Sequence, residues 1–571
     1  MRKKYLSQKK QKVKALPYFF LAPTILLFVA FSYYPFLKNA LLAFSLTDKR
    51  GNFVKWVGFA NFQRLFNKSA FWLVVKNTFV FAFIVATLTL LMAMILALIS
   101  YKTRRGCRIY QTMFSIPMSI ASVPASAIFL FMLKKDGFVN RIFGTTTAWL
   151  QNASTALPSV AVATVWLSIG ASFIFLLVGF RNVPQELLES ATIDGAGPIK
   201  RAFSIMIPIA SPQIFFVVFL NIGHSFKAFG QIKLLTGGGP AKASETLVYS
   251  IYNEALQNGR FETACANAII LFLIIFIFIR IQFAVEKKGG ILQMKATYLT
   301  RRTIDNLDLI LKILIGLALL FPLFICLSYS LRPDTELMNR SKSILPETWT
   351  LQHFQWVFKY VPVFQYIKNS FICCAIVICS QVLFGSLCAY ALAFFNFPLK
   401  AFFFAVIITT MMIPGDVTII SNFLNIQALG LRNTYAGMTL PFLISCMSVL
   451  LMRQFYLSIP SEFKEAATID GCGDIGFFAR IAVPLSVPSI ISLAIYEFIM
   501  IYNQYFWPLL VNTKDSMYTI QIGMSMLVGH ESDEVGRVLA GAIICIIPST
   551  TIFVIGQKYL VQGMTAGAIK G

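Results

Sequence analysis

The sequence predicts an all-α polytopic membrane protein in which two six-helix halves share one chain, with about 12 transmembrane helices in total. Hydrophobic residues make up 57% of the 571 residues, and Phe alone occurs 55 times. This apolar content is too high for a soluble protein of several domains. Apolar runs long enough to cross a bilayer recur along the chain, and one charged segment between two such runs occurs twice.

The predicted spans are runs of about 20 apolar residues, the length of a helix that crosses the hydrocarbon core. In the first half they lie at 16–37, 71–100, 110–133, 156–180, 205–229 and 264–285. In the second half they lie at 309–331, 366–395, 401–427, 434–455, 481–507 and 537–560. Prolines inside several runs predict kinked or broken helices, which neighbouring helices can stabilise: Pro23, Pro117, Pro124, Pro322 and Pro414.

The distribution of Lys and Arg predicts the orientation. The basic tail MRKKYLSQKKQKVK precedes the first span, and YKTRRGCR lies between the second and third, so both are placed in the cytoplasm. The loop 38–70, external in this interpretation, also carries basic residues, so the bias is incomplete. We expect cytoplasmic N- and C-termini and four parts: a basic tail (1–15), a first half (16–285), a cytoplasmic linker (286–308) and a second half (309–571).

One charged segment occurs twice, as PQELLESATIDGAGPIKRAFSIMIPIASP at 184–212 and as PSEFKEAATIDGCGDIGFFARIAVPLSVP at 460–488. The two copies align without a gap at a constant offset of 276 residues. This regularity indicates an internal repeat. Each copy follows the fourth span of its half, which places both copies in the cytoplasm.

The local sequence of each copy predicts a short helix, a sharp turn and a second helix. Pro184 and Pro460 suit a first helical turn, and two Glu three residues apart fall on one face near its positive end. The Asp-Gly pair then ends the helix, because Gly takes the left-handed conformation at low cost. An amphipathic helix on the lipid surface is the alternative, but such helices are rich in Lys and Arg. The acidic face favours a basic protein partner.

The pattern E-x-x-E-[AS]-A-x-I-D-G resembles the cytoplasmic loop of permeases in ATP-binding-cassette (ABC) importers. The segments LPYFFLAPTILLF, VGFANFQRLF and LLTGGGP resemble one carbohydrate-uptake permease, and PLSVPSIISLAIYEFIMIYNQYFWPLL and GAIKG resemble its partner permease. FGQIKLLTGGGP and TLVYSIYNEA look most like the glycerol-3-phosphate subfamily, although Gly230 stands where carbohydrate permeases often carry an acidic residue. The resemblance implies a type I ABC importer permease, with its two subunits fused in one chain.

The resemblance also implies partners. The duplicated segments would couple to two ATPase subunits through Glu186, Glu189, Ala191, Asp194, Gly195 and Gly197 and through Glu462, Glu465, Ala467, Asp470, Gly471 and Gly473. The chain has no G-x-x-x-x-G-K-[ST] phosphate-binding loop, so ATP and Mg²⁺ are expected on the ATPases. An extracytoplasmic solute-binding protein would deliver the solute across the outer loops, and the location would be a bacterial cytoplasmic membrane.

Polar residues within spans are candidates for the substrate pathway, because burying them in lipid is costly. His224 and Lys227 near the outer end of the fifth span are suited to an anion, although Lys227 can equally extend to the interface. Asn503, Gln504 and Trp507 are suited to a polyol. Glu497, a carboxylate inside a span, is suited either to the pathway or to a structural ion pair. Helix packing and the interfacial aromatic belt explain these residues equally well. The sequence does not identify the solute.

Several other functions are disfavoured. The net charge is +25, and the basic residues lie in short runs beside apolar segments. This distribution is typical of juxtamembrane segments and not of nucleic-acid binding. The chain has three His, with no metal-ligand spacing, so we expect no metal site and no catalytic centre. A gradient-driven secondary carrier with two six-helix halves is the alternative transport function. Such carriers commonly have a Gly/Asp/Arg-rich loop between the second and third spans. The segment at this place here, YKTRRGCR, has basic residues but no Asp.

Overall fold

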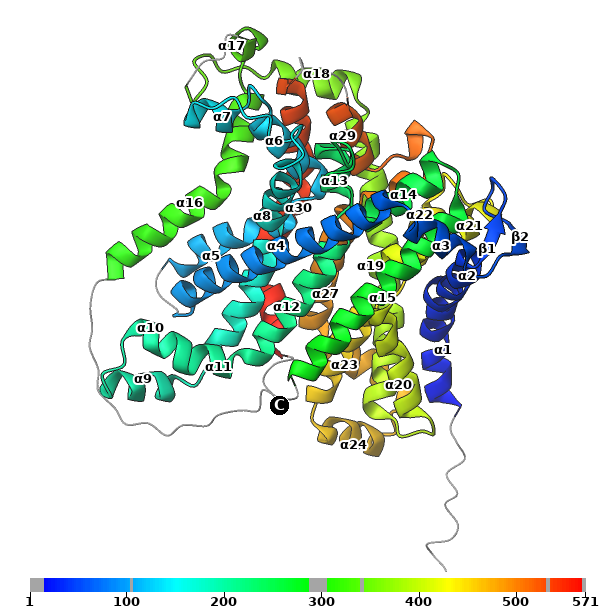
Figure 1. Ribbon diagram of the computed structural model, residues 1–571. Helices are drawn as coiled ribbons and strands as arrows, with labels where there is room; N and C mark the ends of the chain where they lie inside the picture. The colour runs from blue at the N-terminus through cyan, green and yellow to red at the C-terminus, as the bar shows by residue number, and fades with distance from the viewer. Residues whose placement is uncertain (1–14, 103–105, 287–304, 339–342, 530–534, 567–571) are drawn as a thin grey trace, which may run out of the picture.

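The computed structural model describes residues 15–102, 106–286, 305–338, 343–529 and 535–566 (Figure 1). This described part is built from helices and one two-stranded antiparallel hairpin. Helices dominate because a backbone in hydrocarbon must satisfy its own N–H and C=O groups. The predicted tail and most of the predicted linker, 287–304, lie outside the described residues.

The elements of the first half begin with the entry span and the hairpin and end at the linker. They are α1 (Leu16–Phe28), α2 (Tyr34–Ala43), β1 (Ser45–Thr47), β2 (Phe53–Trp56), α3 (Ala60–Phe66), α4 (Ser69–Ser100), α5 (Cys107–Ser115), α6 (Ser122–Leu133), α7 (Phe138–Phe143), α8 (Ala156–Arg181), α9 (Gln185–Ile193), α10 (Pro198–Arg201), α11 (Ile207–Ile209), α12 (Ser211–Phe226), α13 (Gly230–Leu235), α14 (Leu247–Tyr252) and α15 (Phe261–Glu286).

The second half repeats this order without a hairpin in its described residues. Its helices are α16 (Asp305–Ser330), α17 (Asp334–Met338), α18 (Gln352–Tyr360), α19 (Val363–Phe394), α20 (Lys400–Thr409), α21 (Gly415–Ala428), α22 (Tyr435–Thr439), α23 (Cys446–Ser458), α24 (Ser461–Ile469), α25 (Asp474–Phe477), α26 (Val483–Leu485), α27 (Val487–Tyr502), α28 (Phe506–Val511), α29 (Ile520–Gly529) and α30 (Val535–Ala566).

The helices that can cross a membrane match the predicted spans. Seven are continuous, and five more form when two helices separated by a bend of more than 40° are taken together, which gives up to 12. The bent pairs are Cys107–Ser119 with Ser122–Phe143 (98°), Pro198–Ile209 with Ser211–Phe226 (75°), Lys400–Met412 with Gly415–Ala428 (94°), Tyr435–Phe442 with Cys446–Ser458 (52°) and Asp474–Leu485 with Val487–Tyr502 (71°). The predicted polytopic helical fold is therefore confirmed.

The proline-based prediction of broken helices is only partly right. The breaks after Ser119 and before Gly415 fall beside Pro117, Pro124 and Pro414 as expected. Pro23 and Pro322 instead lie inside uninterrupted helices, which tertiary packing can stabilise despite the lost hydrogen bond.

The first span of each half packs against the other half (Figure 1). α1 lies against α19, where the Thr24 hydroxyl donates to the Phe384 carbonyl at 3.0 Å. In the reverse direction, α16 lies against α5 and α6, and the Trp166 indole of α8 donates to the Leu319 carbonyl at 2.7 Å. Because each half holds a span of the other, the two halves are interlocked.

A buried ionic cluster fastens the loop that follows α16. Arg332 is fully buried, and its Nε lies 3.4 Å from a carboxylate oxygen of Glu336. Its Nη2 donates to the Ser343 carbonyl at 2.7 Å. His353 of α18 is 1% exposed, and its Nε2 lies 2.8 Å from the Arg332 carbonyl. The cluster therefore joins the ends of α16, α17 and α18.

The protonation of His353 predicts a pH-dependent stability. Burial lowers the pKa of His353 from its ordinary value of 6.5, against the smaller opposing effect of Asp334. Below about pH 6.5 the unfolded chain binds more protons than the folded chain, so the free energy of unfolding falls as pH falls. Thermal unfolding of the purified chain between pH 7.5 and pH 5 measures this loss. His353→Gln should reduce it, and an unchanged pH dependence in that variant would contradict the assignment.

Candidate functional site

The two copies of the duplicated segment fold into the same series of elements. α9 in the first half and α24 in the second, here called the loop helices, begin and end at positions that differ by 276 residues. The same offset relates α10 to α25, α11 to α26, α12 to α27 and α13 to α28. Figure 1 shows both loop helices on the side of the molecule opposite α17 and α18. The internal repeat is therefore a repeat of structure.

The Asp-Gly pair ends each loop helix as the sequence predicts. Gly195 and Gly471 have φ of +77° and +79°, the left-handed region. The next backbone N–H bonds back across the turn, from Ala196 to the Ala191 carbonyl and from Cys472 to the Ala467 carbonyl, both at 2.8 Å. This is the Schellman pattern of helix ends.

The structure corrects the predicted place of the two prolines and shows where the second glycine of each copy lies. Pro184 and Pro460 precede the first helical residue as N-caps and do not lie in the first turn. Gly197 and Gly473 are the N-caps of α10 and α25, and a Cβ at either would meet nothing within 4 Å. These two glycines therefore lie at open positions on the surface.

The carboxylates of both loop helices face outward. All six predicted acidic residues are exposed, while Ala191 and Ala467 are buried against the rest of the fold. The Gln185 amide donates to Glu189 at 2.9 Å, which leaves the second carboxylate oxygen of Glu189 available. The exposed acidic residues are Glu186, Glu189, Asp194, Glu462, Glu465 and Asp470.

Large apolar side chains close to these carboxylates along the chain are also exposed, and they are absent from the predicted set of coupling residues. Ile199 is 74% exposed and Ile475, its equivalent at the 276-residue offset, is 60% exposed. Ile469 at the end of α24 is 86% exposed. In the sequence Ile199 and Ile475 look like part of the approach to the next apolar span, and only their matching positions in the repeat could have identified them. Ile469 is the Ile of the repeated E-x-x-E-[AS]-A-x-I-D-G pattern. An apolar patch with an acidic rim is typical of a protein interface.

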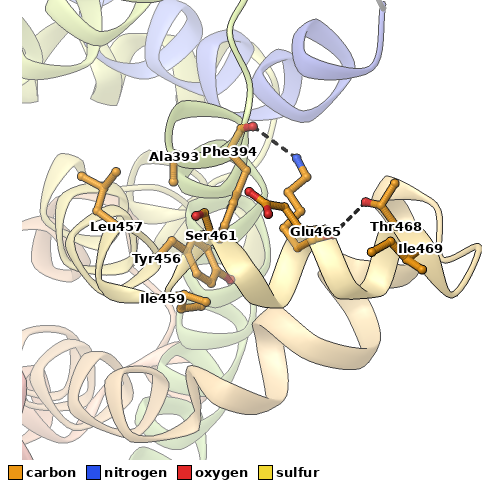
Figure 2. Close-up of a pocket in the computed structure, with 10 residues that line it drawn as sticks. Ala393, Phe394, Tyr456, Leu457, Ile459, Ser461, Glu465, Thr468 and Ile469 are labelled. Atoms are coloured by element: carbon orange, nitrogen blue, oxygen red, sulfur yellow. Dashed lines mark hydrogen bonds between the residues drawn. The ribbon is translucent and has the colours of Figure 1, made fainter.

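The second loop helix is fastened to the end of α19 by one cation. The Lys464 ammonium donates to the Phe394 carbonyl at 3.2 Å and lies 3.5 Å from Asp474 and 4.7 Å from the centre of the Phe395 ring. Beside it a groove of about 670 Å³ opens between α24 and the ends of α19 and α23. Figure 2 shows Phe394, Tyr456 and Glu465 around this groove.

The first loop helix is fastened differently. Leu188 stands at the position equivalent to Lys464 and is 8% exposed. Arg201 of α10 donates to the Thr192 hydroxyl of α9, which joins the two helices of this segment to each other. The two loop helices therefore present similar carboxylates but are held in the fold by different bonds.

Each loop helix is followed, after its Asp-Gly turn, by a bent span. In the first half the chain passes through a π-helical turn, Ala202–Met206, before the 75° bend into α12. The second half has the matching turn Phe478–Ala482 and a bend of 71° into α27. The turns 194–197 and 470–473, which contain Gly195 and Gly471, connect each loop helix to the bent span that follows it.

Four of the predicted pathway residues lie near the ends of α12 and α27. His224 is in the last turn of α12, and Lys227 is the residue at which this helix ends; both are exposed. Asn503 occupies the position equivalent to Lys227 and donates to the Ser119 carbonyl of the first half at 3.0 Å. Gln504 follows it and is half-buried. These residues are placed at the ends of the two bent helices.

The remaining two pathway candidates are engaged inside the protein. Trp507 is 3% exposed, and its indole donates to the Gly437 carbonyl at 3.2 Å. Glu497 is 4% exposed, and its carboxylate lies 3.2 Å from the Gln381 amide and 3.3 Å from the Ser445 hydroxyl. Both side chains therefore join α27 and α28 to neighbouring helices in this conformation.

A family model described as the binding-protein-dependent transport system inner membrane component matches residues 89–289 and again residues 381–566. Together the two matches cover more than half of the chain. The chain belongs to this family. It is a polytopic inner-membrane permease of the ABC importer class that contains the family domain twice, and the alternative of a gradient-driven carrier is set aside. A permease of this class works with a solute-binding protein and an ATPase.

Individual relatives of this permease are about half its length. The arabinooligosaccharides transport system permease protein AraQ of Halalkalibacterium halodurans is 33% identical over 254 residues, which cover 44% of this chain and 91% of AraQ. The sn-glycerol-3-phosphate transport system permease protein UgpA of Agrobacterium fabrum is 33% identical over 281 residues, 48% of this chain and 96% of UgpA. The chain is therefore about twice as long as a single permease, as a fusion requires.

Among solved structures, a bacterial ABC transporter involved in the import of the acidic polysaccharide alginate matches this permease with a TM-score of 0.41 and 21% identity. The match covers 45% of this chain and 99% of that one. The alginate transporter in complex with its pentasaccharide-bound periplasmic protein matches with a TM-score of 0.42 and 24% identity, over 48% and 93%.

Proposed function

We propose that this single chain supplies the whole transmembrane pathway of an ATP-driven importer, and that it binds two ATPase subunits, one at each loop helix. The duplication of the loop helix carries this proposal. Each copy offers three exposed carboxylates and an exposed Ile at equivalent positions, so the chain presents two similar docking surfaces. The coupling residues are Glu186, Glu189, Ala191, Asp194, Gly195 and Gly197 and their equivalents Glu462, Glu465, Ala467, Asp470, Gly471 and Gly473.

Transport follows from moving the two loop helices relative to one another. ATP and Mg²⁺ bind to the ATPases, whose closure draws α9 and α24 together. Each loop helix is joined by the turn at 194–197 or 470–473 to a bent span that ends in α12 or α27, and the interlocked first spans keep the halves joined as they tilt. The result is alternating access through the seam between the halves, with the loop helices and both termini in the cytoplasm.

The solute is proposed to be a carbohydrate or a glycerol-3-phosphate-like molecule, in accord with the names of the two relatives. The ends of α12 and α27 offer a cation and neutral donors for such a molecule, through His224, Lys227, Asn503 and Gln504. Glu497 and Trp507 join the pathway only if their present hydrogen bonds open. A solute-binding protein docks on the outer loops 38–70, 235–262, 332–365 and 508–536.

Subunit ratios test the proposal. Native mass spectrometry of the purified complex should find one copy of this chain with two ATPase subunits. Glu465→Lys should leave one ATPase on each chain, because the Glu189 surface is intact. Two copies of the chain with two ATPases would contradict the proposal.

A further inference from the structure

Figure 1 shows α2 and α21 away from the loop helices. A groove opens between the outer ends of α2 and α21. Its volume is about 530 Å³, and it has one wall from each half of the chain. Tyr34, Leu37, Lys38 and Leu41 follow the i, i+3, i+4, i+7 pattern along one face of α2. Leu424 of α21 forms part of the opposite wall, and the turn 50–53 of the hairpin closes the end of the groove.

The walls of the groove have the character of a lipid-facing surface. Tyr34 is 53% exposed, Leu37 65% and Leu41 47%. All three belong to a helix that crosses the membrane and ends at Ala43. Large apolar side chains at this depth contact acyl chains, and the end of the span places the hairpin turn at the level of the headgroups.

The headgroup end of the groove is cationic. The Lys38 ammonium lies about one and a half turns before the end of α2 and donates to the Asn425 amide oxygen at 2.8 Å. This neutral partner leaves its charge uncompensated. Arg50 lines the groove from the turn. None of the described residues that line the groove carries a carboxylate; Asp48, two residues before Arg50, is outside the lining and accepts hydrogen bonds from the backbone N–H groups of Arg50 and Asn52 and from the Asn52 side-chain amide. An apolar groove that ends in two cations is complementary to an anionic amphiphile.

The turn that closes the groove is held rigidly. Asp48 accepts hydrogen bonds from the backbone N–H groups of Arg50 and Asn52, both at 2.8 Å. Gly51 has φ of +79°, and a Cβ there would lie 2.6 Å from a methyl carbon of Leu424. The turn of the first half is therefore seated directly on α21 of the second half, so the groove exists only where the two halves meet.

We propose that this groove binds an anionic phospholipid of the leaflet farther from the loop helices. Its phosphate lies between Lys38 and Arg50, and one acyl chain runs toward the membrane interior along Leu37 and Tyr34. The site is separate from the solute pathway and from the ATPase surfaces. A bound lipid contacts both α2 and α21, and so joins the two halves at the membrane surface.

Lipid retention tests this site on the full-length chain. The wild type and a Lys38→Gln/Arg50→Gln variant are exchanged into nanodiscs of 1:1 phosphatidylglycerol and phosphatidylcholine, and bound lipids are counted by native mass spectrometry after extraction. Each of the two cations that line the groove is expected to contribute about 1 kcal/mol at the bound phosphate, a factor of about five in the affinity for anionic lipid. The variant should therefore bind phosphatidylglycerol about 25-fold more weakly than the wild type.

Two further variants make the outcome decisive. Lys49→Gln/Lys55→Gln removes the same charge from the same hairpin, but neither residue lines the groove, so this control should retain phosphatidylglycerol. Ala428→Trp fills the groove without changing its charge and should expel the lipid. Equal loss in the Lys38/Arg50 and Lys49/Lys55 variants would overturn the proposal, as would full retention in the Ala428 variant. If the Lys38/Arg50 variant keeps its lipid but no longer binds the solute-binding protein, the groove is a docking site for that protein and the lipid proposal is wrong.

Discussion

Charge reversal of both loop helices, by Glu189→Lys with Glu465→Lys, is expected to abolish ATP-driven uptake while the chain remains folded. Both carboxylates are exposed on the surface, so their loss leaves no buried charge unpaired. A like charge at a protein interface costs several kcal/mol. A cost of about 3 kcal/mol at each site weakens ATPase binding by roughly 100-fold or more per site. Uptake into proteoliposomes that contain ATP and the ATPase measures this effect.

The neutral variant Glu189→Gln with Glu465→Gln is the matched control, because it keeps the shape of both side chains. It should lose much less uptake than the Lys variant, since it introduces no repulsion. Size-exclusion profiles and thermal unfolding of the three chains should coincide. Normal uptake by the Lys variant would show that these carboxylates do not couple the chain to its ATPases.

Among the substitutions proposed here, Glu336→Gln is expected to lower the free energy of unfolding most. Arg332 is fully buried and has its Nε 3.4 Å from Glu336, so the substitution leaves a guanidinium charge without its counter-ion. Breaking a buried ion pair from one side typically costs about 3 to 5 kcal/mol. The Ser343 carbonyl and the face of Tyr329, 4.0 Å from the guanidinium carbon, keep contact with Arg332 but do not neutralise it. A reduced melting temperature in detergent measures the loss.

The double variant Arg332→Met with Glu336→Leu separates the cost of the unpaired charge from the loss of packing. Replacing both members of a buried pair by apolar residues of similar size is often nearly neutral. The double variant should therefore melt closer to the wild type than Glu336→Gln does. The opposite order would mean that the pair itself contributes most of the stability.

The membrane-spanning helices could be predicted from the sequence. A run of about 20 apolar residues in lipid satisfies its backbone hydrogen bonds only as a helix. The repeat at 276 residues also predicted the duplicated loop helices, down to the left-handed Gly195 and Gly471. Both predictions rest on local chemistry. The domain boundaries at 285 and 309 stay predictions.

The bends were less predictable because they depend on tertiary packing. The 75° and 71° bends before α12 and α27 fall between prolines of the repeat, Pro208 and Pro212 in the first copy and Pro484 and Pro488 in the second. Pro23 and Pro322 are in uninterrupted helices. A proline therefore marks a possible break, and the contacts around it decide whether the helix bends.

The exchange of first spans and the apolar part of the docking surface were missed for a different reason. Nothing in the run 16–37 indicates that α1 packs on α19 of the other half. Likewise, Ile199 and Ile475 follow the apolar composition of the spans next to them, and only the fold exposes them. Contacts between distant segments carry no local signal in a single sequence.

This permease is proposed to carry two ATPase docking surfaces on the same side of the membrane. Replacing Ile199 or Ile475 with a photo-cross-linking amino acid in the assembled complex tests it most directly, because both side chains are exposed beside the acidic residues. Irradiation should join one ATPase to each single variant and two to the chain that carries both replacements. A chain that captures an ATPase from only one position, or from neither, would contradict the account.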